Sequence, residues 1–451
     1  MLNQTIVAIA TAPINQAISI IRISGNNTYE FVNKVFNKDI LQQKGHTLIT
    51  GYIIDYDNNK IDQVVLACYR GSKSFTGEDT IEINCHGGIL ITQKILQLLL
   101  TTGMRMAQRG EFTRRAYLNN KIDLIAAEAV NDLIMAENNS TLKTAINSLS
   151  GKTKILIDEL ASQLLALIAN INVNIDYPEY DGIEQTTISN VTPLVEKFLN
   201  KIKIIKKHSE IAKTIKEGIN TVIIGKPNVG KSSLLNALLN EDKAIVSNQA
   251  GTTRDLVEGK INLGDITLNL IDTAGIHHTI NEIEQAGISK SHQALNQSDL
   301  IILVLDGSKQ ISKEDEALLT IIKNKNYLIA INKLDLGLKL KLDVKNKFNV
   351  VKISAINNEI SNLISAIKNK IMTTEINFNQ ELLLINTRQL AYLDEIELNI
   401  SNALVDLKKF IAIDFVIIHL QTAWNKILEM QDKKFKTNLL DEIFKKFCLG
   451  K

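Results

Sequence analysis

Residues 221–239 read TVIIGKPNVGKSSLLNALL and contain a complete phosphate-binding loop. Four residues separate Gly225 from Gly230, and Lys231 and Ser232 follow directly. A strand pattern precedes the loop and an amphipathic helix pattern follows it, which is the context that this motif requires. The glycines let backbone N–H groups turn toward phosphate oxygens, the lysine reaches the β- and γ-phosphates, and the serine offers its hydroxyl to Mg²⁺. The stretch therefore predicts an α/β domain that binds a nucleoside triphosphate.

Two later segments indicate which base is bound. LNLIDTAG places Asp272 at the end of a predicted strand, where a carboxylate suits the Mg²⁺ shell. LIAINKLD places Asp335 after another strand, where its carboxylate can accept both N1–H and the 2-amino hydrogens of guanine, neither of which adenine offers. The order and spacing resemble the GTPase superfamily and predict GTP as the ligand. The expected contacts are Asn228, Val229, Gly230, Lys231, Ser232, Ser233, Asp272, Thr273, Ala274, Gly275, Asn332, Lys333, Asp335, Ser354 and Ala355.

Apolar periodicity divides the rest of the chain. Alternating runs at residues 18–25, 63–69 and 79–86 predict strands and an α+β domain. Later segments have helical spacing, but neither helical half covers its own apolar stripes, so we expect one helical domain interrupted by the GTPase domain. The predicted boundaries are 1–120 (α+β), 121–216 (first helical half), 217–372 (inserted Ras-like α/β domain) and 373–451 (second helical half). The expected stripes are Leu160, Leu164, Ile168 and Ile171; Leu194, Phe198, Ile202 and Ile205; and Leu390, Leu393, Ile396, Ile400, Leu404 and Leu407.

Composition excludes several classes of protein. The 451 residues are 45% hydrophobic and 22% charged, as in a globular protein with buried cores. A formal net charge of +2 gives no broad attraction to nucleic acid, so RNA contacts would come from basic runs such as 201–207 and 433–436. Such runs are usually solvated helix faces, which is the interpretation we favour. Cys68, Cys85 and Cys448 are too widely spaced for a disulfide framework and favour a reducing cytoplasm.

Membrane and export signals are not expected. The first residues lack the basic segment and the long apolar run of a signal peptide. The longest apolar stretch, residues 154–176, is interrupted by Asp158 and Glu159, which favours a buried helix over a membrane span.

The hydrolytic step cannot use the arrangement of Ras-type enzymes. Those enzymes place a water-orienting glutamine directly after the DTAG segment. Here Ile276 occupies that position and cannot hydrogen-bond to water. Another group orients the water, or the protein only binds GTP.

Several motifs together resemble the MnmE (TrmE) family of tRNA-modifying GTPases over essentially the full length of the chain. They are SFTGED at 74–79, HGG at 86–88, RGEFTRRAYLNNKIDL at 109–124, GKPNVGKSS at 225–233, AGTTRD at 250–255, DTAG at 272–275 and FCLGK at 447–451. The phosphate loop and AGTTRD recur in related GTPases, whereas the N-terminal motifs joined to the CLGK ending are more specific.

The resemblance implies a potassium-dependent GTPase whose G domains dimerise across the nucleotide. A monovalent cation at the phosphates would supply the positive charge that an arginine finger provides elsewhere. For the residue that orients the water, it implies Glu284, with Glu282 as an open alternative. For Arg254 we favour a structural ion pair or a contact outside the chemistry. The implied K⁺ ligands are Asn228, Ser247, Gln249 and Thr252 in a loop that includes Asn248, Ala250 and Gly251, and the implied Mg²⁺ ligands are Ser232 and Thr253.

The resemblance also implies a folate site in the N-terminal domain, which is the family's homodimer contact. The implied contacts are Arg22, Glu82, Lys121 and Lys451. Strand alternation puts Glu82 opposite Ile81 and Ile83, so it faces either the folate or only solvent. Cys68 and Cys85 are interpreted as core thiols.

The ending FCLGK fits a prenylation signal poorly because glycine and lysine occupy its last two positions. In the family this tail runs toward the folate pocket. Whether Cys448 reacts covalently or only holds the tail stays open, since thiolate character depends on its pKa.

The resemblance implies the GTPase subunit of a two-protein enzyme in the cytoplasm, acting on tRNA without a membrane. Its partner would be the FAD-dependent MnmG (GidA), in a heterotetramer that installs a 5-aminomethyl or 5-carboxymethylaminomethyl group on the wobble uridine. The one-carbon donor would be 5-formyltetrahydrofolate or 5,10-methylenetetrahydrofolate. An RNA-binding GTPase of ribosome assembly is the main alternative, but no KH-like RNA module is recognisable. A regulatory switch with slow, potassium-independent hydrolysis is the second.

Overall fold

A computed structural model describes most of the chain. The described residues are 4–176, 188–239, 259–271, 295–341, 349–371 and 384–431, together with Phe444, Phe447 and Gly450. They form two compact units, one of residues 1–131, 148–157 and 427–451, the other of residues 132–147 and 158–426.

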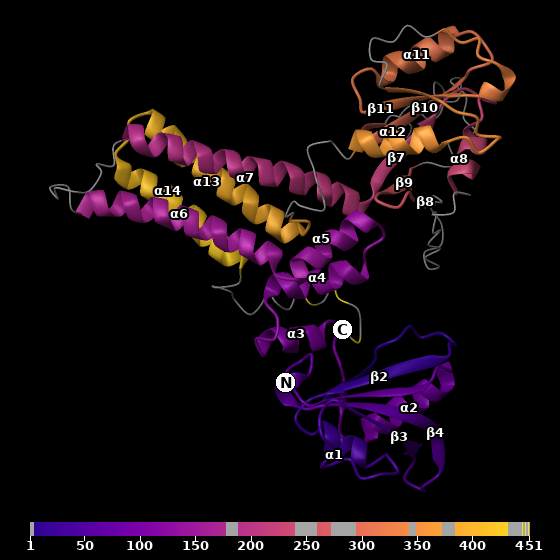
Figure 1. Ribbon diagram of the computed structural model, residues 1–451, viewed down its shortest axis with the longest axis vertical. Coiled ribbons are helices and arrows are strands. Elements are labelled where there is room, and N and C mark those ends of the chain that lie inside the picture. The colour runs from indigo at the N-terminus through magenta and orange to yellow at the C-terminus, as the bar shows by residue number, and fades with distance from the viewer. Residues whose placement is uncertain are drawn as a thin grey trace. The chain divides into compact units, whose positions relative to one another are not determined.

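The first unit is built on a six-stranded sheet with the order β3-β4-β5-β2-β1-β6. All pairs except the parallel β1–β6 pair are antiparallel. The strands are β1 (Ile6–Ile9), β2 (Ile18–Ser24), β3 (Thr47–Ile54), β4 (Lys60–Tyr69), β5 (Thr80–His86) and β6 (Arg105–Met106), and the helices are α1 (Thr28–Asn33), α2 (Ile89–Thr101) and α3 (Glu111–Leu118) (Figure 1). The three strands expected from alternation are confirmed.

The two faces of this sheet differ in chemistry. One face buries the alternating Ile21, Ile23, Ile81 and Ile83 against the two helices α1 and α2, and Cys68 and Cys85 are buried there as expected. Burial raises the pKa of both thiols, so they stay protonated. The opposite face carries the polar residues of the same strands, as the period of two requires.

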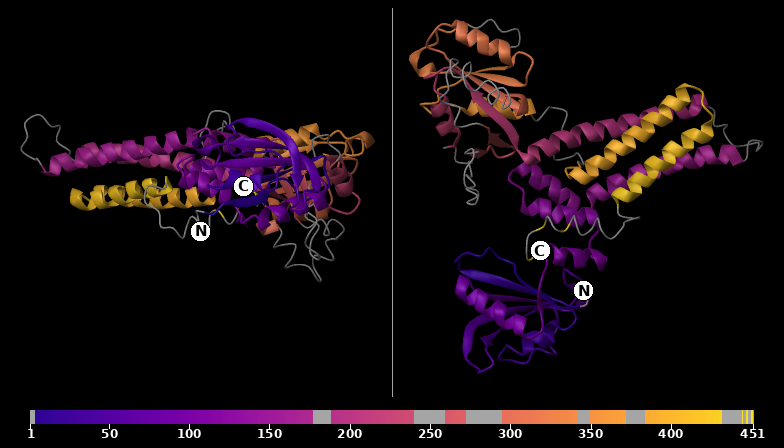
Figure 2. Two further views of the ribbon diagram at one scale, coloured as in Figure 1. Left: turned by 90° about the horizontal axis from the view of Figure 1, so that it is seen from below. Right: turned by 180° about the vertical axis from the view of Figure 1, so that it is seen from behind.

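Long helices follow the first sheet along the chain and return near its end. They are α4 (Leu124–Ile134), α5 (Asn139–Leu149), α6 (Lys152–Asp176), α7 (Ile188–Glu217), α13 (Thr387–Lys408) and α14 (Ile413–Met430). Helices α7 and α13 pack side by side along their length, although about 170 residues of chain separate them (Figure 2). The chain therefore leaves the helices, forms the second sheet and returns, as the apolar stripes predicted.

The expected stripes are mostly buried. All four stripe residues of α6 are buried, and those of α13 are buried except for the half-buried Leu404. The prediction for α7 is wrong in part, because Leu194 is 50% exposed and Ile205 is half-buried. Val191 and Val195 fill the interface instead, since the helix is turned by about one residue from the expected orientation.

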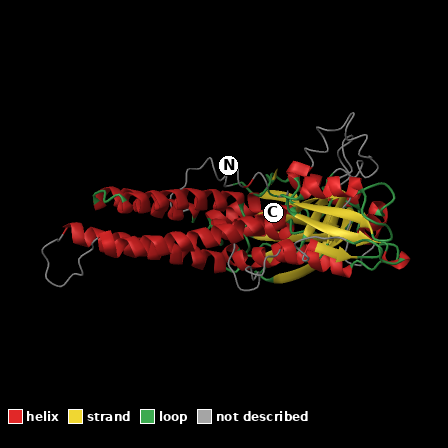
Figure 3. Ribbon diagram, turned by 90° about the horizontal axis from the view of Figure 1, so that it is seen from above, coloured by secondary structure: helices red, strands yellow, loops and turns green. Residues whose placement is uncertain are grey.

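Helix α6 also passes a test for membrane spans by length and composition, through residues Lys152–Val173. We expected Asp158 and Glu159 to exclude such a span, and by that test they do not. A third of the window is buried in the protein, and core helices of soluble proteins pass the same test. One helix of this kind is weak evidence for a membrane. Figure 3 shows these helices in red.

The second sheet has the order β12-β11-β10-β7-β9-β8 and is parallel except for the β8–β9 pair. Apolar clusters cover both of its faces, which is the doubly wound arrangement that was expected. Strand order reverses at β7 and β10, and ligands bind beyond the carboxyl ends of strands at such a point. The strands are β7 (Ile219–Ile224), β8 (Gly259–Asn262), β9 (Thr267–Leu270), β10 (Leu300–Asp306), β11 (Tyr327–Asn332) and β12 (Val350–Lys352), and the helices are α8 (Lys231–Leu239), α11 (Lys313–Ile322) and α12 (Ser361–Ile371).

Candidate functional site

The phosphate loop connects β7 to α8 at this reversal point. Gly225, Asn228 and Gly230 have φ values of 153°, 63° and 98°, a left-handed region that glycine and asparagine tolerate. The Lys231 ammonium is 2.8 Å from the carbonyl oxygens of both Gly225 and Lys226. Lys231 is buried, and this burial lowers its pKa. Backbone carbonyls thus hold the Lys231 ammonium at the start of α8, and the N-terminus of a helix is a place where phosphate binds.

Residues of the expected guanine motif donate hydrogen bonds to carbonyls of the phosphate loop. The Asn332 amide donates to the Val229 carbonyl at 3.0 Å and accepts from the Ala355 N–H at 3.0 Å. The Lys333 ammonium donates to the Asn228 carbonyl at 2.6 Å. These contacts join the two ends of the site, because they link the phosphate loop to the ends of β11 and β12.

A serine orients Asp335, the carboxylate that the sequence predicts for base recognition. The Ser354 hydroxyl donates to Asp335 Oδ1 at 2.6 Å, and Asp335 is otherwise exposed. Its second oxygen makes no hydrogen bond that involves the described residues, so it remains available to guanine. A cavity of 360 Å³ lies over the loop, lined among others by Asn228, Lys231 and Ser232. Its donors and its position fit a nucleoside triphosphate.

Sequence reasoning missed one residue that supports this motif. Asp306, at the end of β10, accepts from the Lys333 ammonium at 2.8 Å and from the Ser308 hydroxyl at 2.6 Å. Burial raises its pKa, but the hydrogen bonds from Lys333 and Ser308 outweigh burial and lower it. The signal was its place at the end of a fully apolar strand.

Many expected site residues lie outside the described residues. They are Ser247, Asn248, Gln249, Ala250, Gly251, Thr252, Thr253 and Arg254; Asp272, Thr273, Ala274, Gly275 and Ile276; Glu282 and Glu284; and Cys448 and Lys451. Their roles stay predictions.

A second polar site lies on the face of the first sheet that is opposite α1 and α2. Arg22 on β2 and Glu82 on β5 are paired in register, and Arg22 Nε donates to Glu82 Oε1 at 2.7 Å. Arg22 Nη1 donates to the Gly450 carbonyl at 3.2 Å, and the guanidinium carbon lies 5.7 Å from the centre of the Phe112 ring. Glu82 therefore faces away from the core, as alternation predicted, and Arg22 joins it to the tail of the chain.

The tail is fixed by close packing near this pair. Phe444 and Phe447 are buried in a cluster with Leu124 and Ala127. Gly450 has a φ of 89°, and a Cβ there would collide with the carbonyl oxygen of Ile9. Only glycine fits this approach without strain.

Lys121 lies apart from the pair. Its ammonium donates to the Ser72 carbonyl at 2.6 Å, its stem runs beside Gly77, and it lines a separate open cavity of 760 Å³. The structure thus brings Arg22 and Glu82 together, but it shows no contact of Lys121 with either.

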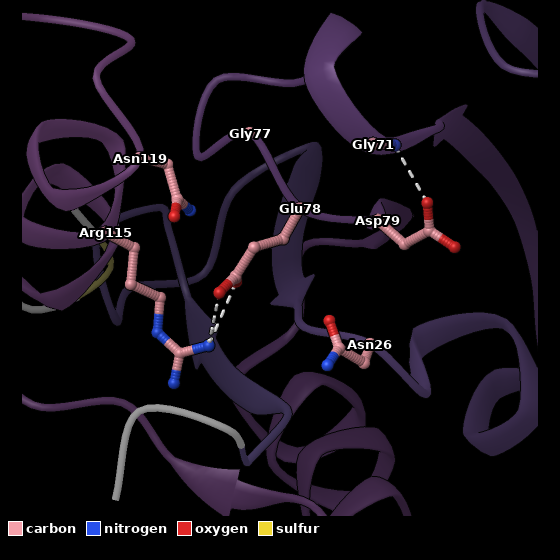
Figure 4. Close-up of a pocket in the computed structure, with 7 residues that line it drawn as sticks. All are labelled: Asn26, Gly71, Gly77, Glu78, Asp79, Arg115 and Asn119. Atoms are coloured by element: carbon pink, nitrogen blue, oxygen red, sulfur yellow. Dashed lines mark hydrogen bonds and ion pairs between the residues drawn. The ribbon is translucent and has the colours of Figure 1, made fainter.

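A polar pocket of 460 Å³ lies beside the loop that contains SFTGED. Figure 4 shows Glu78 and Arg115 pointing toward each other across it, and Asp79 accepting from the Gly71 N–H at 2.8 Å. The Arg115 guanidinium is 2% exposed and lies 2.9 Å from Glu78 Oε2. Asn26, Gly77 and Asn119 complete the lining.

A buried charge network continues behind this pocket. Glu111 accepts from Arg105 at 2.5 Å and from Arg115 at 2.9 Å, and it also accepts from the Gln108 N–H at 2.8 Å. Burial raises the pKa of Glu111, but these hydrogen bonds outweigh burial and lower it to about 2. Glu78 and Arg115 lie in the motifs SFTGED and RGEFTRRAYLNNKIDL, but nothing in the spacing of these motifs shows that the two residues pair.

Comparison with known proteins matches both parts of the chain. The family model "MnmE helical domain" matches residues 124–448, and "GTP-binding protein TrmE N-terminus" matches residues 5–121. The tRNA modification GTPase MnmE of Mycoplasma mycoides subsp. mycoides is 42% identical over 100% of both chains, and that of Acholeplasma laidlawii is 42% identical over 99% of both. The FeoB G domain of Methanococcus jannaschii is 26% identical over 34% of this chain and 98% of its own, with a TM-score of 0.25 that supports no conclusion here.

Proposed function

The chain belongs to the MnmE family of tRNA modification GTPases, and from this premise we propose that it modifies carbon 5 of the wobble uridine of certain tRNAs. GTP hydrolysis in tRNA modification is the activity of the family, and the phosphate loop and guanine motif described above fit GTP. In the proposal, the chain acts in the cytoplasm as a homodimer, together with an FAD-dependent partner of the MnmG (GidA) type and with tRNA.

The nucleotide chemistry follows from the residues around the phosphate loop. Lys231, whose ammonium lies beside the carbonyls of Gly225 and Lys226, would neutralise the β- and γ-phosphates, and the Ser232 hydroxyl would hold Mg²⁺. Asn228 is exposed, lines the cavity and makes no side-chain hydrogen bond that involves the described residues, which supports a role as a K⁺ ligand. A bound K⁺ would supply positive charge at the phosphates.

The Arg22–Glu82 pair carries the folate part of the proposal. The aminopyrimidine edge of a folate presents N–H donors, which need a carboxylate, and Glu82 uses only one oxygen on Arg22. Arg22 pairs with this carboxylate and also donates to the Gly450 carbonyl, so one side chain joins Glu82 to the C-terminal segment. The folate would supply the one-carbon unit of the modification.

Nucleoside mass spectrometry tests the proposed function. A bacterial host that lacks its own family member is complemented with this chain and its cognate partner, and its tRNA is digested and analysed. We expect 5-aminomethyl-type uridines to return, and not to return with a Lys231→Met chain. An unchanged profile, despite soluble protein that hydrolyses GTP, would favour the ribosome-assembly alternative.

Glu284 is proposed to orient the attacking water. Glu284→Ala should then abolish turnover and leave the dissociation constant of GTP nearly unchanged, because the carboxylate acts only in the transition state. Glu282→Ala is the matched variant. Potassium-stimulated hydrolysis that survives in Glu284→Ala would contradict the assignment.

A further inference from the structure

A second lysine of the phosphate loop is tied to a helix on its far side. The Lys226 ammonium is 2.7 Å from both the Ser312 hydroxyl and Asp315 Oδ2. Ser312 is the N-cap of α11, and Asp315 is 3% exposed in its first turn. The loop is thereby joined to an element that makes none of the nucleotide contacts proposed above.

The two acceptors of Lys226, Ser312 and Asp315, are also hydrogen-bonded to each other. Ser312 and Asp315 form a capping box, in which Asp315 Oδ2 accepts from the Ser312 N–H at 3.0 Å and from its hydroxyl at 2.9 Å. Asp315 Oδ1 is buried and makes no hydrogen bond within the described structure. A buried carboxylate with one unpaired oxygen adds little to the stability of the fold, because its desolvation is not fully compensated. Asp315 therefore indicates a role other than stability.

The backbone of Lys226 links Asp315 to the phosphate-binding lysine. Its carbonyl accepts from the Lys231 ammonium at 2.8 Å, so one residue contacts the rigid cap through its side chain and the phosphate-binding lysine through its backbone. We propose that Asp315 and Ser312 position the phosphate loop through Lys226. This contact fixes the position of the Lys231 ammonium at the site where the phosphates bind. Lys226 and Asp315 are positioning residues, since neither reaches the reacting atoms.

The inference rests on nucleotide binding at the phosphate loop and not on the folate, potassium or tRNA parts of the proposal. A displaced loop weakens contacts made equally to bound substrate and transition state. Loss of the contact of Lys226 with Asp315 and Ser312, called the brace below, should therefore raise KM for GTP and the dissociation constant of GDP. The value of kcat at saturating GTP should change little.

The test compares two lysine–carboxylate pairs of similar geometry. Lys226→Met removes the brace, and Lys226→Arg keeps a cationic donor. Lys216→Met is the control, because Lys216 and Asp132 are 2.6 Å apart and similarly buried but lie away from the loop. Steady-state GTP hydrolysis, fluorescent GDP dissociation and thermal unfolding are measured on the full chain.

We expect Lys226→Met to raise KM and the GDP dissociation constant about tenfold, with kcat within about twofold of wild type. Asp315→Asn should shift both constants in the same direction, and Lys226→Arg should restore them. The control should lose thermal stability only. Nucleotide constants of Lys226→Met that match those of Lys216→Met overturn the inference, whereas failure of the wild-type chain to bind GTP overturns the nucleotide assignment as well.

Discussion

The phosphate loop and the Arg22–Glu82 site differ in how far apart their residues lie along the chain. The loop is one contiguous segment that contains its own glycines and the lysine expected to bind phosphate. Arg22 is bonded to a residue 60 positions away and to another 428 positions away. A contiguous site can be recognised in the sequence as a motif, whereas a dispersed site is assembled only when the chain folds. The two sites should therefore fail in different ways.

Loss of Lys231 gives the largest expected effect. Lys231→Met should reduce kcat/KM for GTP about a thousandfold, because a buried donor to the phosphates is removed. Binding of 5-formyltetrahydrofolate to the same chain, measured by calorimetry, should stay unchanged, and exposed Lys309→Met should alter neither. Folate binding that falls together with hydrolysis would break the comparison, because the sites would not be independent.

Base recognition should respond to a single oxygen. Asp335→Asn should weaken GTP about a hundredfold, because an amide cannot accept two hydrogen bonds from guanine as the carboxylate does. Xanthosine triphosphate should gain in relative affinity, since its 2-oxo group accepts from the new amide. Competition binding with both nucleotides measures the change. An equal loss for both would show that Asp335 only supports the loop.

The charge network of the first unit should show a dependence on pH. The pKa of Glu111 is held at about 2 in the folded protein, below its ordinary value of 4.5, so its stabilisation is present above pH 4.5 and is lost as pH falls toward 2. Glu111→Gln should lower the opening free energy of the β2 amides by about 2 kcal/mol at pH 7. Hydrogen exchange at pH 7 and pH 3 measures it. The difference should be smaller at pH 3 than at pH 7, and a difference of equal size at both values would exclude the charge as its cause.

The smallest effect is expected at Glu82. Glu82→Gln keeps the size of the side chain but removes its charge, so affinity for 5-formyltetrahydrofolate should fall about tenfold. GTP turnover should stay the same, and exposed Glu30→Gln should change neither. Unchanged folate affinity would mean that the carboxylate only pairs with Arg22.

Sequence predicted what is local and periodic. Alternation along β5 placed Glu82 opposite Ile81 and Ile83, and the loop motif placed Lys231 at the start of α8. Helical spacing identified the buried face of α13 but misplaced that of α7, because Leu194 and Val195 are adjacent apolar residues and only packing decides between them.

Contacts between distant segments could not be predicted in this way. Glu78 and Arg115 are 37 residues apart in two separate motifs, and no period relates them. The same holds for Lys226 and Asp315, whose pairing depends on how α11 packs beside the loop. The tertiary fold determines which charged residues pair, and the sequence alone does not identify the partner of either residue.

The bond from Arg22 to the Gly450 carbonyl has a consequence for the order of synthesis. Strand β2 leaves the ribosome early, but its partner is translated 428 residues later. At typical elongation rates the delay is roughly 20 to 90 s. During that time the first sheet can fold around its apolar face, while Arg22 still lacks its tail contact. A nascent chain or a truncated product can thus contain a folded GTPase domain and still have an incomplete Arg22–Glu82 site.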